Sequence, residues 1–208
     1  ITIAQNIADN VKKKYGRDSA IIPNGVEIPP VADKEDFLEK FELQRHKYIL
    51  AVGRFVPEKG FDVLIEAFNQ GKFDRWKLVI VGDADHDDLY SRKLKAKVSK
   101  KNDNIILTGF LTGQPLHELY SHAGLFALPS YYEGLPIVLL EAMSYGLSCI
   151  ASDIPANRNV ELEGNRFFKT GDIDSLTTKM KEFIAKSWEE EDRKKQIDMI
   201  AEKYNWMN

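Results

Sequence analysis

The feature that most constrains this chain is an alternation of short apolar runs with segments whose apolar residues recur at helical spacing. Phe61, Leu64, Ile65 and Phe68, for example, follow the 3, 4, 7 spacing of an amphipathic helix. The apolar runs between such segments have the length and composition of buried strands. The candidate strands are residues 48–52, 78–81, 104–107, 125–128, 149–151 and 166–168. This alternation predicts an α/β fold with a doubly wound parallel sheet of about six strands.

The two ends of the chain have their own patterns. Ile3, Ile7 and Val11 form a helical stripe near the N-terminus, and residues 19–22 are a short strand candidate. Further helices are predicted over residues 89–101, 115–122, 176–184 and 189–204. The chain does not begin with Met and opens in a helical pattern, so we expect it to be part of a longer protein. We divide it into residues 1–25, a helix and strand leading from a missing domain, and residues 26–208, the α/β domain.

Residues 129–146 are the most informative stretch, because they join a buried strand to a helix through a loop that carries acid groups. Pro136 suits the first helical position, and Gly146 suits the position after the last helical residue. Glu133 therefore lies in the loop and Glu141 on the helix. Carboxylates accept hydrogen bonds, so both suit the hydroxyls of a sugar. The simpler alternative is that Glu133 is a loop acid and Glu141 a solvated helix residue.

The same loop offers a place for an anion. Gly134, followed by Leu135 at the start of the helix, exposes unpaired backbone N–H groups and the partial positive charge of a helix N-terminus.

Residues 53–60 place a guanidinium and an ammonium group at the first strand-to-helix turn. Gly53 lets the backbone approach a ligand, Arg54 suits bidentate phosphate contact, and Lys59 is a mobile point charge. The alternative is a solvated loop in which Lys59 pairs with its neighbour Glu58.

Composition and two further segments narrow the possible functions. The net charge of −3 gives no basic field for nucleic acid, and no apolar run approaches the roughly 18 residues that cross a bilayer. The single cysteine, Cys149, lies in an apolar run and is predicted to be a core residue. The acidic segment 83–88 lacks the Gly and Glu of a calcium loop, having Asp88 and Leu94 at those positions, so we interpret it as a solvated loop.

Several of these segments together resemble one enzyme family. Residues 133–143, Glu-Gly-Leu-Pro-Ile-Val-Leu-Leu-Glu-Ala-Met, are similar to the two-glutamate motif of the retaining GT-B glycosyltransferases of family 4, glycosyl transferases group 1. Residues 53–60 resemble the family's Gly-Arg-x-x-x-x-Lys-Gly segment, and residues 22–26, Ile-Pro-Asn-Gly-Val, its passage from the N-terminal domain. Residues 109–113 resemble the segment beside the nucleotide base. Ser148 departs from the Pro that is usual in the family at that position.

The resemblance implies a Rossmann-like fold, the C-terminal half of a GT-B enzyme that transfers a sugar from a nucleoside diphosphate sugar to an acceptor hydroxyl with retention. Arg54, Lys59 and Glu133 would act in catalysis, without a metal or other cofactor. The whole implied donor site comprises Gly53, Arg54, Lys59, Phe110, Leu111, Glu133, Gly134, Leu135, Pro136 and Glu141. Phe110 and Leu111 would lie beside the base, Glu133 would hold the sugar, and Glu141 the ribose. A plain turn remains the alternative for Phe110 and Leu111.

The resemblance also sets expectations about partners. The donor would be a UDP-, GDP- or ADP-sugar, and a carbohydrate or lipid-linked acceptor would bind through the missing N-terminal domain, so we expect the isolated domain to be inactive. The expected location is cytoplasmic, with peripheral contact at the inner face of the membrane as an option. Trp206 resembles an aromatic position before the family's final crossover helix. The alternatives are a sugar-nucleotide epimerase of GT-B fold and a non-catalytic doubly wound interaction module.

Overall fold

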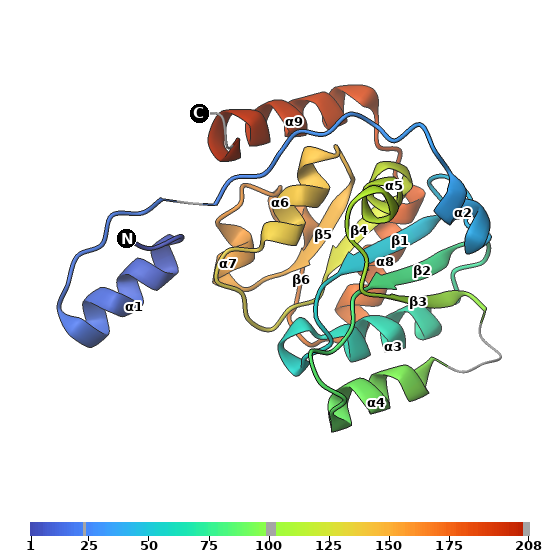
Figure 1. Cartoon of the computed structure of the whole chain (residues 1–208), viewed down its shortest axis with the longest axis horizontal. Coiled ribbons are helices and arrows are strands. Elements are labelled where there is room, and N and C mark those ends of the chain that lie inside the picture. The colour runs from blue at the N-terminus through green and yellow to red at the C-terminus, as the bar shows by residue number, and fades with distance from the viewer. Residues whose placement is uncertain (23, 99–102, 206–208) are drawn as a thin grey trace.

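A computed structural model describes residues 1–22, 24–98 and 103–205 of the chain. Its centre is one six-stranded sheet in which all neighbouring strands are parallel, in the order β3-β2-β1-β4-β5-β6 (Figure 1). The strands are β1 (Tyr48–Val52), β2 (Lys77–Val81), β3 (Ile105–Gly109), β4 (Leu125–Leu128), β5 (Cys149–Ser152) and β6 (Phe167–Phe168). The predicted fold class is confirmed. Trp206, expected at an aromatic position before a final crossover helix, lies outside the described residues.

Helices cover both faces of the sheet, which explains why the strands are almost uniformly apolar. One face carries α3 (Phe61–Gly71), α4 (Leu89–Lys97) and α8 (Ile173–Ala185), and the other α5 (Gln114–His122), α6 (Ile137–Ser144) and α9 (Glu190–Tyr204). The other helical segments of the described residues are α1 (Gln5–Tyr15), α2 (Asp36–Lys40), η1 (Pro57–Lys59), α7 (Pro155–Arg158) and η2 (Gly164–Arg166).

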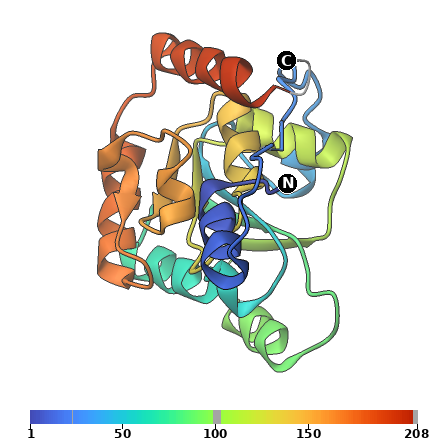
Figure 2. The ribbon, with the colours of Figure 1, turned by 90° about the vertical axis from the view of Figure 1, so that its left-hand side faces the viewer.

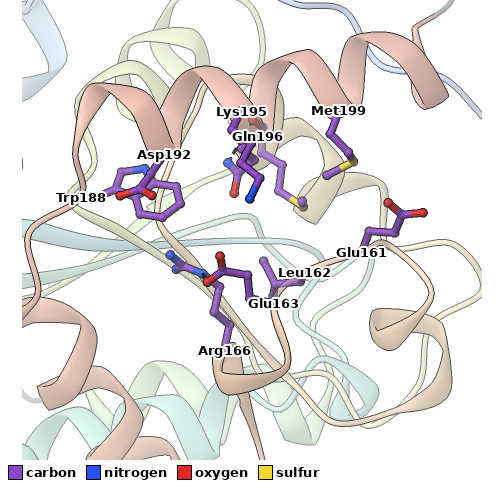
Figure 3. Close-up of a pocket in the computed structure, with 10 residues that line it drawn as sticks. Glu161, Leu162, Glu163, Arg166, Trp188, Asp192, Lys195, Gln196 and Met199 are labelled. Atoms are coloured by element: carbon purple, nitrogen blue, oxygen red, sulfur yellow. Dashed lines mark hydrogen bonds and ion pairs between the residues drawn. The ribbon is translucent and has the colours of Figure 1, made fainter.

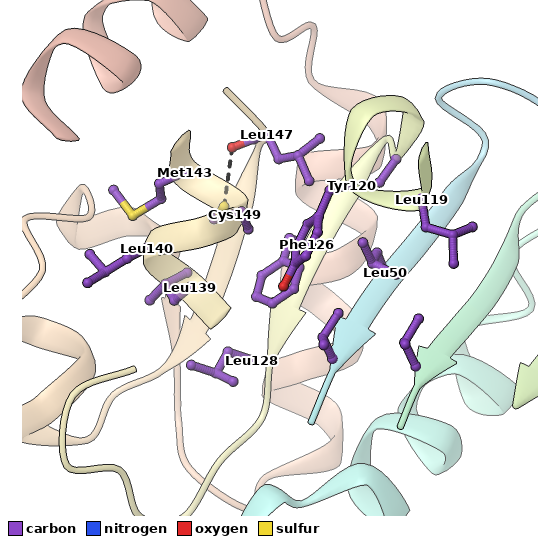
Figure 4. Packing of buried hydrophobic residues seen from close by; sticks show 14 of the residues in the cluster. Leu50, Leu119, Tyr120, Phe126, Leu128, Leu139, Leu140, Met143, Leu147 and Cys149 are labelled. Atoms are coloured by element: carbon purple, nitrogen blue, oxygen red, sulfur yellow. Dashed lines mark hydrogen bonds between the residues drawn. The ribbon is translucent and has the colours of Figure 1, made fainter. Parts of the chain in front are cut away.

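The core beneath α5 and α6 is closely packed and holds the elements around the candidate site in place. Figure 4 shows Leu139, Leu140 and Met143 from α6 in the same cluster as Phe126 of β4, all of them fully or almost fully buried. Each such side chain contributes roughly 1.5–3 kcal/mol through removal from water. Cys149 belongs to this cluster, and burial raises the pKa of its thiol to about 12, so it is a core residue as predicted.

The start of α6 differs from the prediction. Pro136 precedes the helix as its N-cap, with a non-helical ψ of 74°, and the first helical residue is Ile137. A residue before proline is disfavoured in the helical region, so the helix does not include Leu135. Leu139 and Leu140 donate their N–H groups to the Pro136 carbonyl, at 2.9 and 3.2 Å. The predicted end is confirmed, because Gly146 follows the helix with a left-handed φ of 68°.

The N-terminal segment lies beside the main body rather than within the sheet (Figures 1 and 2). The prediction of a strand over residues 19–22 is wrong, because Ile21 forms only an isolated bridge with Thr2. Two other expected strand residues, Asn104 and Arg166, lie just before β3 and β6.

The connector that follows, residues 26–45, is fastened to the domain. Val26 forms a parallel bridge with Asn205, and both Phe37 and Leu38 donate their N–H groups to Glu118 Oε1 of α5, at 2.6 and 2.8 Å.

Candidate functional site

The loops that leave β1, β2 and β3 approach one another closely at the carboxyl ends of the strands. Gly82 donates its N–H to the Gly109 carbonyl at 2.9 Å, and Gly53 donates to the Val81 carbonyl at 2.9 Å. A Cβ atom on Gly82 would lie 1.9 Å from the Gly53 carbonyl oxygen, so only glycine fits there. In open parallel sheets this edge is where ligands bind.

The two predicted cations lie together in the loop after β1. The lysine stem packs over Gly53, since a Cβ added there would lie 3.5 Å from Lys59 Cδ and Cε. Arg54 follows Gly53 directly and forms an exposed ion pair with Asp85 of the next loop, with 2.8 Å between Nη1 and Oδ2. The geometry therefore brings a guanidinium and an ammonium group to the end of one strand.

Lys59 also joins this loop to the loop after β4. Its Nζ lies 2.6 Å from Glu133 Oε1, and the two side chains are only 18% and 9% exposed. Ser130 donates its hydroxyl to the same Glu133 oxygen at 2.7 Å. The predicted alternative, a pair between Lys59 and Glu58, is not what the structure shows, because Glu133 is the acid that holds Lys59.

Gly60 sets the distance between the same two loops. It has a left-handed φ of 64°, and an added Cβ would lie 2.4 Å from the carbonyl oxygen of Pro129. The Tyr131 N–H donates to the Glu58 carbonyl at 2.8 Å. These contacts fix the β1 and β4 loops against each other, so the backbone positions of Lys59 and Glu133 are fixed relative to each other.

Glu141 lies in a groove between α5, α6 and the connector rather than on a solvated helix face. The Tyr120 hydroxyl donates to Glu141 Oε2 at 3.1 Å. Burial raises the pKa of the Glu141 carboxyl, and the hydrogen bond from Tyr120 opposes that rise. The groove has a volume of about 550 Å³, and its lining also includes Glu27, Gly113 and His117.

The predicted site residues do not all line one cavity. The lining of the Glu141 groove does not include Arg54, Lys59 or Glu133. Gly134 and Leu135 line a separate hollow beside α1, where a Cβ on Gly134 would lie 3.4 Å from Ile7 Cδ1.

The remaining predicted residues flank these loops. Phe110 is 78% exposed at the end of β3, and Leu111 packs partly against the core. The structure thus brings Lys59 and Glu133 into contact and places the other predicted residues on neighbouring loops.

Three polar residues that the sequence analysis did not select contact the candidate residues. Ser130 and Tyr120 hydrogen-bond to the two glutamates, and Asp85 pairs with Arg54. Ser130 lies within residues 129–146, three residues before Glu133, so its position in the sequence could have indicated this contact. Tyr120 falls among the apolar positions of α5, where a tyrosine is indistinguishable by spacing from any core residue.

The acidic loop after β2 has mainly structural contacts. Asp88 caps α4 by accepting the Ser91 N–H at 2.7 Å, and Asp83 pairs with Lys95. Arg92 holds the pKa of Asp87 below its usual value. Among the residues that the structure describes, no group of three or more metal-ligating side chains occurs.

A second hollow, of about 210 Å³, lies under α9, away from all the predicted site residues (Figure 3). Its inner wall is Arg166, which is 1% exposed and whose guanidinium lies over the rings of Phe183 and Trp188 at 4.6 and 4.2 Å. Arg166 Nη1 donates to Ser148 Oγ and the Cys149 carbonyl, at 3.0 and 3.2 Å. These contacts tie the chain before β6 to the start of β5, so we assign Arg166 a packing role.

The strand order defines a doubly wound α/β domain, and the charged side chains of the β1 and β4 loops mark a candidate ligand site at its strand ends. Comparison with known proteins identifies the family. Residues 33–204 match the model of the glycosyl transferases group 1, and the chain belongs to that family.

The curated relatives include named glycosyltransferases. The chain is 33% identical over 122 residues to the amylovoran biosynthesis glycosyltransferase AmsD of Erwinia amylovora, covering 57% of this chain and 34% of the relative. It is 33% identical over 172 residues to the UDP-Gal:alpha-D-GlcNAc-diphosphoundecaprenol alpha-1,3-galactosyltransferase of Escherichia coli, covering 76% and 43%. The chain thus spans less than half the length of these relatives.

Solved structures share the fold. Sucrose-phosphate synthase from Thermosynechococcus elongatus aligns with a TM-score of 0.82 at 21% identity, over 99% of this chain and 54% of the other. Anabaena Alr3699/HepE in complex with UDP aligns with a TM-score of 0.85 at 17% identity, over 98% and 59%. No helix in the described ranges has both the length and the apolar character needed to cross a membrane.

Proposed function

We propose that this chain is the donor-binding domain of a retaining GT-B glycosyltransferase. It binds a nucleoside diphosphate sugar, and the whole enzyme transfers the sugar to an acceptor hydroxyl with retention of anomeric configuration. The observation that carries this proposal is the arrangement of Arg54, Lys59 and Glu133 at the ends of β1 and β4. The complex of HepE with UDP supports a nucleotide ligand for this fold.

The hard step in such a transfer is separation of an oxocarbenium-like sugar from the departing diphosphate. Arg54, Lys59 and the N–H groups near Gly134 provide fixed positive charge that stabilises the negative charge on the leaving oxygen. These groups need no reorganisation when the bond breaks, because the loops that carry them are already fastened together. In this proposal the chain's own cations supply the charge, and no metal is required.

The carboxylates bind hydroxyl groups of the donor. Glu133 accepts hydrogen bonds from the donor sugar, and Glu141 accepts them from the ribose, while Phe110 and Leu111 flank the base. When the diphosphate arrives, it is a better partner than Glu133 for the Lys59 ammonium group. Lys59 then releases Glu133. Diphosphate binding thereby frees the acid that holds the sugar.

The acceptor site belongs to the part of the enzyme that precedes this chain. The name of the E. coli relative specifies a diphosphoundecaprenol-linked acceptor. A carbohydrate or lipid-linked acceptor, used at the cytoplasmic face of the membrane, fits that precedent. The isolated chain is then expected to bind nucleotide but to transfer little sugar.

Isothermal titration calorimetry with UDP and GDP tests the donor site. Arg54→Ala and Lys59→Ala should each weaken binding about tenfold or more, because each removes one charge-assisted hydrogen bond. Arg92→Ala is the matched control, since Arg92 is a surface cation on α4 that pairs with Asp87 of the preceding loop. Unchanged binding in both site variants would contradict the assignment.

Retention is tested separately on the full-length enzyme. The anomeric configuration of the first product, read from its proton NMR coupling constant, should match that of the donor. An inverted product would remove the retaining mechanism while leaving the donor site intact. Release of an isomerised sugar without acceptor would instead indicate an epimerase, which family membership does not favour.

A further inference from the structure

Tyr120 is a buried tyrosine whose hydroxyl reaches a candidate ligand-binding acid. The side chain is 2% exposed on α5, and its ring stacks on that of Tyr145 at a centroid distance of 5.0 Å and an interplanar angle of 16°. On the sheet side it packs against Phe126, as Figure 4 shows, at a centroid distance of 6.0 Å. With the ring held on both sides, the hydroxyl has a fixed position 3.1 Å from Glu141 Oε2.

A second polar contact supports the same stack from the groove side. The Tyr145 hydroxyl lies 2.8 Å from His117 Nδ1, and both side chains line the groove that contains Glu141. Tyr145 directly follows α6, and His117 lies on α5. The stack and its two hydrogen bonds therefore fix α5 and α6 relative to each other at the place where the carboxylate projects.

This arrangement restricts how Glu141 presents its carboxylate. A glutamate side chain has three rotatable bonds. If they rotated freely before binding, fixing them when a ligand binds would cost conformational entropy. The bond from Tyr120 engages Oε2, so a ligand hydroxyl in the groove would be received by the second oxygen. A hydroxyl donor beside a half-buried carboxylate also favours its ionised form, the form that accepts hydrogen bonds best.

We propose that Tyr120 is a positioning residue that holds Glu141 in the orientation needed to accept the ribose hydroxyls of the donor. This inference rests on the proposed function, because it takes Glu141 as the ribose-binding acid. Tyr120 lines the same groove but is only 2% exposed, and its hydroxyl is engaged by Glu141, so we assign it to Glu141 rather than to the ligand. Its contribution is to hold Glu141 in place before the ligand binds. A substitution that removes only the hydroxyl should therefore weaken ligand binding.

Tyr120→Phe removes the hydroxyl and keeps the ring stack. We expect binding of UDP or GDP to weaken about threefold to tenfold, which corresponds to the net contribution of about one hydrogen bond. Tyr48→Phe is the matched control, because Tyr48 is also buried and donates its hydroxyl to the Leu119 carbonyl of the same helix at 2.6 Å. The two variants should lose similar thermal stability, and only Tyr120→Phe should lose affinity.

The pH dependence of binding separates positioning from a structural effect. Without the Tyr120 hydroxyl the pKa of Glu141 rises further, because burial then acts unopposed. As the pH is lowered, Glu141 is therefore protonated earlier in Tyr120→Phe. The loss of binding should begin at a higher pH in this variant than in the unsubstituted protein. The other titratable groups that line the groove are His117, Tyr145 and Glu27. Recording both profiles in a His117→Gln background removes the imidazole from the groove.

Each outcome decides the question. The inference is supported if Tyr120→Phe binds nucleotide more weakly and loses binding at a higher pH, and if Tyr48→Phe shows neither change. Unchanged affinity and pH profile, or equal changes in both variants, would overturn it while leaving the donor site standing. Failure of the unsubstituted protein to bind UDP, GDP or ADP would overturn the proposed function and this inference with it.

Discussion

The Lys59–Glu133 pair provides the most quantitative prediction, because its geometry and burial are both defined. The atoms Nζ and Oε1 lie 2.6 Å apart, and the side chains are mostly buried. Exposed ion pairs contribute at most about 1 kcal/mol, and breaking a fully buried pair costs about 3–5 kcal/mol. Ser130 continues to bond Glu133 when Lys59 is removed. We therefore expect Lys59→Met to lower the free energy of unfolding by about 1–3 kcal/mol.

A double-mutant cycle isolates the interaction itself. Urea unfolding of the unsubstituted protein, Lys59→Met, Glu133→Gln and the double variant should give a coupling energy of about 1–2 kcal/mol. High salt should reduce this value only slightly, since partly buried pairs are screened weakly. Effects that add to within about 0.3 kcal/mol would show that the pair is not an energetic unit, and the reasoning would fail.

The same pair links stability to binding. Glu133→Gln removes the acid that competes for Lys59, so binding of UDP without a sugar should be at least as tight as in the unsubstituted protein. Binding of a UDP-sugar should lose its added affinity, because the carboxylate that holds the sugar is gone. Calorimetry with both ligands measures this difference, and equal losses for the two ligands would contradict it.

Three further predictions follow from single contacts. Gly60→Ala should cost at least about 2 kcal/mol of stability, because the new Cβ meets the Pro129 carbonyl at a left-handed φ, whereas Gly164→Ala meets nothing within 4 Å and should be neutral in urea unfolding. Asp85→Asn should tighten UDP binding about twofold to fivefold by releasing Arg54, and Asp87→Asn, in the same loop, should not. The buried His122 has a pKa lowered chiefly by burial. As the pH falls below the ordinary His value of about 6.5, the unfolded chain takes up this proton more readily, so stability should fall, and less so in His122→Gln.

Much of the fold was predictable because parallel strands buried on both faces are continuous apolar runs. The strand expected over residues 19–22 shows the limit of that signal. Its apolar residues fit a strand, but a strand needs neighbours, and Ile21 has only one bridge to Thr2. The start of α6 lies one residue later than predicted, because the ψ of 74° at Pro136 is outside the helical region and leaves Pro136 as the N-cap.

The candidate site was predictable where chemistry lies close in sequence, and not where it depends on distant partners. The cations and acids were identifiable from their residue types and turn positions. The partner of Lys59 was not, since Glu133 lies 74 residues away and Glu58 is its direct neighbour. The role of Tyr120 was hidden for the same reason, because the hydrogen bond to Glu141 joins two helices.

The most direct test is a crystal structure of this protein with bound UDP or GDP. The account predicts the diphosphate within hydrogen-bonding distance of the Arg54 guanidinium and the Lys59 ammonium group, with Glu133 released from Lys59 and the ribose at Glu141. A nucleotide bound elsewhere, for example in the hollow beside Arg166, with the Lys59–Glu133 pair still closed, would contradict it.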